Sequence, residues 1–207
     1  MVTAKISLLA PRQRLRRRGF SLAESLLAIT LTSIAGGAIL LGLGSTAQTT
    51  RNVMDRTMAT GIAAQLMDEI LGGRYAAVGA GAYQVGLGPN TYETQGVGRE
   101  RFDDVDDFEG VVAQPVKDEY GVALGLGNET GGQRHPNFRL PSNYFSGWRE
   151  EVNVYYVSEA NPSVRLTGSS TSNLRAVEVR IYRDDGNQGR ELLDTVRRVV
   201  AYVPAPN

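Results

Sequence analysis

Residues 16–29 read RRRGFSLAESLLAI and open the apolar stretch around which the rest of the chain is organised. Glu24 is the last charge for a long distance, because residues 25–47 contain none. A helix of these 23 residues rises about 35 Å, which is enough to cross a hydrocarbon core of about 30 Å. A carboxylate near the start of such a helix costs free energy in lipid, so the sequence predicts that Glu24 has a function.

The residues before Gly19 are basic and contain no anion. Their six cations are Lys5, Arg12, Arg14, Arg16, Arg17 and Arg18. The positive-inside rule predicts that this end stays in the cytoplasm and that the residues after the helix are exported. Two general classes of protein begin in this way. One is a secreted protein cleaved after Ser45-Thr46-Ala47, with Gln48 first, and the other is a protein with an uncleaved signal anchor.

Ser21 and Glu24 also have the spacing of a capping box at the start of a helix. In that motif the side chain of the third helical residue accepts a hydrogen bond from the backbone of the capping residue. This local role for Glu24 is compatible with a role in assembly.

The junction resembles the type IV prepilin signature, in which a basic leader ends in Gly-Phe and an apolar helix carries Glu at its fifth position. Gly19, Phe20 and Glu24 match it position by position. The resemblance implies cleavage between Gly19 and Phe20 by a prepilin peptidase, followed by methylation of the new amine. It also implies assembly into a filament in which Glu24 pairs with the Phe20 amine of an adjacent subunit.

The same resemblance implies a location and a set of partners. The precursor is expected in the inner membrane, single-pass with a periplasmic C-terminal domain, and the mature chain in a pilus or pseudopilus. The expected partners are other pilin or pseudopilin subunits, the prepilin peptidase, an inner-membrane assembly platform and, before assembly, membrane lipid. Many major pilins have a proline where this chain has Leu41 and a disulfide that this cysteine-free chain lacks, which favours a minor pilin or pseudopilin.

Composition and periodicity divide the chain into five parts. We expect a basic leader at 1–19, a transmembrane half of a long helix at 20–47, an amphipathic half at 48–72, a glycine-rich variable region at 73–147 and an antiparallel β-sheet at 148–207. Apolar residues recur every four positions in the amphipathic half, which predicts a helix face laid on a core. These residues are Met54, Met58, Ile62, Leu66 and Ile70.

Alternating apolar residues predict the strands of the last part. Val152, Val154 and Tyr156 share one face of a strand, Val177, Val179 and Ile181 share one face of the next, and a third strand covers 192–203. The turn at 184–187 suits a hairpin between the last two strands. The predicted fold class is α+β, with a long N-terminal helix packed on an antiparallel sheet, as in the pilin fold.

An acidic run at 103–109 is the strongest candidate for a bound cation. Its carboxylates are Asp103, Asp104, Asp106, Asp107 and Glu109. Calcium prefers clustered carboxylate oxygens, although the run lacks the spacing of an EF-hand. Two alternatives are a solvated acidic loop and a short helical turn docked by Phe102, Val105 and Phe108. The run is similar to an Asp-rich segment of minor pilins of the mannose-sensitive haemagglutinin type.

Other chemistry is not expected. His135 is the single histidine, and there is no cysteine, so the sequence predicts no transition-metal site and no enzyme. Apart from calcium no cofactor is expected. Without its leader the chain has 16 cations and 22 anions, so no nucleic-acid partner is expected. The alternative function is a membrane-anchored periplasmic binding module with an uncleaved signal anchor.

Overall fold

The computed structural model describes residues 19–128, 130–184, 186 and 189–203. The predicted basic leader, apart from Gly19, lies outside these residues, as do Asp185 and Asn187 of the predicted turn. The chain forms two compact units, residues 1–50 and 51–207. The helix α1, Leu22–Gly72, contributes to both units.

The part of α1 in the first unit is an apolar helix with no core around it. It runs without a break through Gly36, Gly37, Gly42 and Gly44. Its apolar side chains are exposed, and α1 is long and apolar enough to cross a membrane. The hydroxyls of Thr30, Thr32 and Thr46 donate to carbonyls one turn back. Such bonds satisfy polar groups within the helix, as a lipid-facing segment requires.

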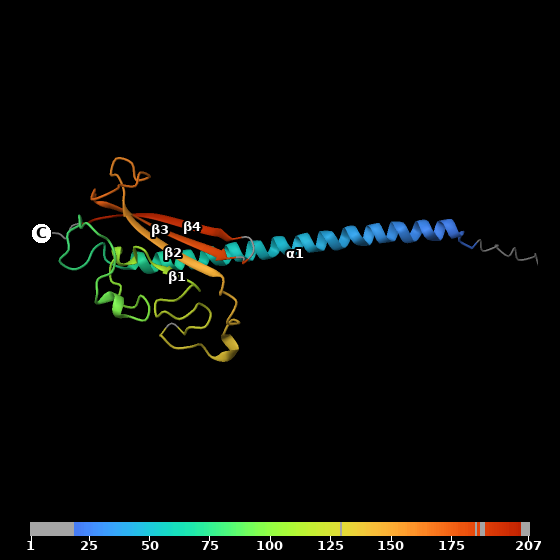
Figure 1. Ribbon diagram of the computed structural model, residues 1–207, viewed down its shortest axis with the longest axis horizontal. Coiled ribbons are helices and arrows are strands. Elements are labelled where there is room, and N and C mark those ends of the chain that lie inside the picture. The colour runs from blue at the N-terminus through green and yellow to red at the C-terminus, as the bar shows by residue number, and fades with distance from the viewer. Residues whose placement is uncertain (1–18, 129, 185, 187–188, 204–207) are drawn as a thin grey trace, which may run out of the picture. The chain divides into compact units, whose positions relative to one another are not determined.

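The second unit contains the remainder of α1 and one four-stranded antiparallel sheet (Figure 1). The strands lie in the order β1-β2-β3-β4. Their bounds are Val112–Ala113, Trp148–Tyr156, Leu174–Asp184 and Arg190–Ala201. Three short 3-10 helices precede or interrupt the strands: η1, Glu93–Gln95; η2, Asp106–Phe108; and η3, Pro136–Phe138. The α+β prediction is therefore confirmed, and the sheet includes β1 from within the glycine-rich region.

The core lies between α1 and one face of the sheet. Every second residue of β2 is buried, as the alternation predicts, and Val177, Val179 and Ile181 of β3 are fully buried. The helix contributes a stripe with helical spacing, formed by Ala59, Ala63, Leu66, Met67 and Ile70.

The predicted stripe is wrong at its start. Met54 is 53% exposed and lines a surface hollow beside Tyr144 and Trp148, while Met58 is only partly buried. The regular spacing of the methionines continues beyond the part of the helix that the core covers. Periodicity gives the face of a helix but not the length over which another element covers that face.

Close backbone contacts explain two glycines of the region 73–147. A side chain at Gly98 would come within 2.2 Å of the carbonyl oxygen of Glu119, and Gly121 has φ +78°. Glycine is the residue that permits both the close approach and the left-handed backbone. The segments around residues 98 and 120 are thereby held together, although neither contains a strand.

Candidate functional site

The helix start forms the predicted capping box. The Ser21 backbone N–H donates to Glu24 Oε2 at 3.0 Å, and the Ser21 hydroxyl donates to the same oxygen at 3.1 Å. In return, the Glu24 N–H donates to Ser21 Oγ at 3.2 Å. This is the reciprocal pattern that satisfies free donors at a helix N-terminus, and it confirms the local role predicted for Glu24.

The surroundings of Glu24 are apolar, and residues 19–50 supply no counter-ion. Residues 19–50 include no lysine or arginine. Phe20 is 83% exposed, and Leu27 and Leu31 line an open hollow beside the carboxylate. Among the described residues Glu24 Oε2 accepts both bonds from Ser21, and Oε1 accepts none. The carboxylate keeps the capacity to accept a further donor, because its two oxygens together offer about four lone-pair sites.

The acidic run folds into a turn that is buried rather than solvated. Asp104, Asp106 and Asp107 are each at most 2% exposed, so the interpretation as a solvated loop is wrong. The turn is η2, and it is docked through Val105 and Phe108, as the alternative based on the apolar spacing predicted. Because Val105 and Phe108 pack in the core, the carboxylates between and beside them are buried as well.

Each carboxylate of the run has a different role. Asp104 Oδ1 accepts the N–H groups of Asp106 and Asp107, at 2.9 and 3.3 Å. Asp106 pairs with Arg175, and Glu109 accepts the N–H of Val154 on β2. These three side chains therefore serve the fold and do not converge on one point.

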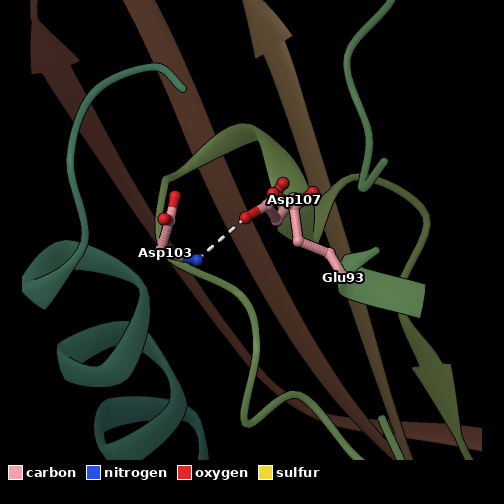
Figure 2. Close-up of side chains that lie close together, drawn as sticks. All are labelled: Glu93, Asp103 and Asp107. Atoms are coloured by element: carbon pink, nitrogen blue, oxygen red, sulfur yellow. Dashed lines mark hydrogen bonds between the residues drawn. The ribbon is translucent and has the colours of Figure 1, made fainter. Parts of the chain in front are cut away.

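Asp103 and Asp107 do converge, and Glu93 joins them (Figure 2). One oxygen from each carboxylate lies within 4.8 Å of the others. Figure 2 also shows the Asp103 N–H donating to Asp107 Oδ2, at 2.9 Å. Of the five predicted ligands the structure thus brings two together. It adds Glu93, a residue ten positions earlier that the sequence reasoning missed because nothing local connects it to the run.

Burial raises the pKa of two carboxylates of the turn, Asp104 and Asp107. It raises the pKa of Asp104 to about 7, and the neighbouring Asp106 carboxylate adds to this effect. Burial likewise raises the pKa of Asp107 to about 6, with Glu93 as the carboxylate that adds to it. Three close carboxylates suit a hard cation such as calcium, which would take the place of protons. Arg74 already pairs with Asp103, so a cation would compete with that arginine.

Two buried arginines hold the second unit together, and both were missed in the sequence. Arg175 is fully buried on β3; its Nη1 donates to Asp106 Oδ1 at 2.7 Å and its Nη2 to the Tyr156 hydroxyl at 3.0 Å. It also lies 4.3 Å from the centre of the Tyr75 ring. The arginine thus links the acidic turn to the sheet by charge-assisted hydrogen bonds.

Arg99 links three segments in the same way. It donates two hydrogen bonds to Glu69 of α1, at 2.9 and 3.0 Å, and one to Glu150 of β2, at 3.0 Å. Burial raises the pKa of Glu150 to about 7, and the nearby guanidinium of Arg99 limits the rise. Glu150 lies among the buried, alternating residues of β2, and a charge in that register is a sequence signal for a buried partner.

His135 lies in an exposed segment immediately before η3. The hydrogen bond that it accepts from the Asn137 N–H, at 3.4 Å, is local.

No protein-family model, curated protein or solved structure matches this chain.

Proposed function

We propose that this chain is a pilin-like subunit, a minor pilin or pseudopilin, that is inserted in the inner membrane and then assembled into a filament. Two features support the proposal. The first is the α+β fold with one long apolar N-terminal helix, which is compatible with a pilin fold. The second is the Gly19-Phe20 junction placed immediately before that helix. The protein acts by assembly and not by catalysis.

The observation that carries the proposal is the state of Glu24. It is the single charge between residues 19 and 50, and it lies on an exposed apolar helix. After removal of residues 1–19, no cationic side chain remains in this part of the chain. A carboxylate in that position is costly unless another molecule neutralises it. The new amine at Phe20 of an adjacent subunit would supply the charge, and the exposed apolar side chains would supply cohesion between helices.

In this mechanism a prepilin peptidase cuts between Gly19 and Phe20 on the cytoplasmic side of the membrane. The Phe20 amine is methylated, and the subunit leaves the lipid for the filament through an assembly platform. The Glu24–Phe20 pair sets the register of the incoming subunit, because a charge pair in an apolar setting tolerates little displacement.

The test is the mass of the N-terminal peptide of the protein purified from its native host. The proposal expects a methylated Phe20 as the first residue. A chain that begins at Gln48 would identify a secreted protein instead. A chain that keeps residues 1–19 would identify a membrane-anchored binding module, and either result would overturn the filament function.

A further inference from the structure

A hollow of about 480 Å³ lies at the open edge of β2, and Glu109, the last carboxylate of the acidic run, is among the residues that line it. Its floor includes Val154, Tyr155 and Tyr156, and one wall is the segment 165–171. The volume falls within the range that is typical of ligand sites. Nothing in the assembly function proposed above uses this hollow.

Backbone groups of the strand point into it. The N–H of Val157 donates to the carbonyl of Leu174, and that of Asp184 to the carbonyl of Gly147, so odd-numbered residues of β2 direct their backbone groups to β3. Even-numbered residues consequently direct theirs to the other edge. At that edge, β1 and the residues before it pair only with the first part of β2. The last backbone hydrogen bonds of this pairing are those of the N–H and the carbonyl of Val152.

The pairing resumes on the far side of the hollow, where the Leu166 N–H donates to the Tyr156 carbonyl at 2.9 Å. Between these two places Glu109 accepts the N–H of Val154 with its carboxylate. Within the described residues the carbonyl of Val154 and the N–H of Tyr156 have no backbone partner. The edge of β2 between these two places therefore offers one hydrogen-bond acceptor, the Val154 carbonyl, and one donor, the Tyr156 N–H, spaced as on the edge of a strand.

The lining of the hollow contains one cation, Arg165, and one anion, Glu109, whose carboxylate is bonded to the N–H of Val154. Arg165 is exposed, lies 4.4 Å from the centre of the Tyr155 ring and has no carboxylate partner in the described part of the chain. Arg197 donates to the hydroxyl of the same tyrosine at 3.1 Å, which adds a second positive charge nearby. A guanidinium that is stacked on a ring and lacks an anion is well placed to pair with a carboxylate.

We propose that this hollow binds a short, extended peptide segment of a partner protein by strand addition to β2. The N–H of the peptide would bond to the Val154 carbonyl, its carbonyl would accept from the Tyr156 N–H, and a carboxylate would pair with Arg165. Strand addition gives affinity through main-chain bonds, and side-chain contacts give specificity. The carboxylate comes either from an Asp or Glu side chain or from a free C-terminus.

The test uses the full-length protein in detergent micelles and fluorescein-labelled hexapeptides, with binding followed by fluorescence anisotropy. The sequence TVTVDV as a C-terminal amide offers only a side-chain carboxylate, and TVTVNV as a free acid offers only the terminal one. The amide of TVTVNV has neither, and a fourth peptide is TVTVDV with N-methylated valines. β-branched residues favour the extended conformation that strand addition requires.

We expect at least one of the two acidic peptides to bind saturably below about 1 mM. Arg165→Ala and the N-methylated peptide should each weaken this binding about tenfold, and loss of the carboxylate should weaken it similarly. Arg101→Ala is the matched control, since Arg101 also lies over a tyrosine, at 4.8 Å from the Tyr92 ring, but outside the hollow. Its affinity should equal that of the wild type.

Hydrogen exchange provides a measurement that a merely structural role of Arg165 would not change. The peptide should slow exchange at the amide of Tyr156 in the wild type and not in Arg165→Ala. The absence of saturable binding by both acidic peptides would overturn the proposal. Equal binding to Arg165→Ala, or equal binding of the N-methylated peptide, would do so as well.

Discussion

The two units of this chain differ in whether their carboxylates have counter-ions. In the second unit the buried carboxylates of Asp106 and Glu150 are paired with arginines of the same chain, Arg175 and Arg99. In the first unit Glu24 has only Ser21 as a partner and no cation within residues 19–50. These buried carboxylates of the second unit thus have counter-ions within their own chain, whereas residues 19–50 supply none for Glu24.

The largest expected effect tests Glu24, the carboxylate without a cation within residues 19–50. Glu24→Ala should reduce incorporation into filaments by about tenfold or more, because the charge that rewards docking is gone. Membrane insertion and cleavage should be retained. The measurement is the amount of mature protein in sheared filaments relative to the membrane fraction of the same cells.

Ser21→Ala is the control that separates assembly from helix capping. It removes a cap worth about 1 kcal/mol and keeps the carboxylate of Glu24. Incorporation of this variant should stay near that of the wild type. Normal incorporation of Glu24→Ala, or an equal defect in both variants, would contradict the pairing role.

The next largest effect tests the buried pair of Asp106 and Arg175 in the second unit. Arg175→Met should lower the free energy of unfolding of the second unit by about 3–5 kcal/mol, because it leaves Asp106 buried without its counter-ion. Denaturant unfolding followed by tryptophan fluorescence measures this loss, since Trp148 lies in the core. Adding Asp106→Asn to the variant should restore part of the stability.

Arg180→Ala is the matched control, because Arg180 pairs with Glu178 where the arginine is 37% exposed. Exposed pairs contribute less than about 1 kcal/mol. If Arg180→Ala cost as much as Arg175→Met, burial would not be what distinguishes the two pairs.

A third prediction concerns pH and Asp104, one of two buried carboxylates of the turn that pair with no arginine among the described residues. The folded pKa of Asp104, about 7, lies above its ordinary value of 3.8, so this group stabilises the fold at low pH. The contribution is lost as the pH rises through about 7. Relative to the wild type, Asp104→Asn should therefore gain on the order of 1–3 kcal/mol between pH 5 and pH 8. Unfolding curves at both pH values measure the difference, and parallel behaviour of the two proteins would refute it.

The smallest expected effect asks whether a cation can complete the group formed by Glu93, Asp103 and Asp107. If calcium binds there with the affinity of extracellular sites, about 1 mM calcium should stabilise the second unit by about 1 kcal/mol. The stabilisation should disappear in Glu93→Gln, and magnesium should give less. A thermal shift that is equal in this variant, or absent in the wild type, would show that the group serves only the fold.

The sequence was sufficient for those parts of the fold that repeat locally. Alternation located β2 and β3, and helical spacing located the buried residues Leu66 and Ile70 of α1 but not Ala59. Local spacing also predicted the capping box of Ser21 and Glu24. Each of these depends on residues a few positions apart, for which geometry follows directly from the periodicity of the element.

The rest depends on contacts between distant residues, which periodicity does not encode. Arg99 reaches Glu69 and Glu150, which are 30 and 51 positions away. Glu93 joins Asp107 only because the glycine-rich region folds back on itself. The charges of the acidic run favour a surface loop, whereas its apolar residues Val105 and Phe108 favour a docked turn, and the sequence alone does not decide between the two.

The capping box at Ser21 has one more consequence. The first turn of α1 is closed by residues that all follow the Gly19-Phe20 bond, and among the described residues none of its hydrogen bonds comes from the other side. Cutting that bond would therefore leave the first turn of the rod as it was before processing. If the bond is cut as proposed, the capping hydrogen bonds between Ser21 and Glu24 are retained.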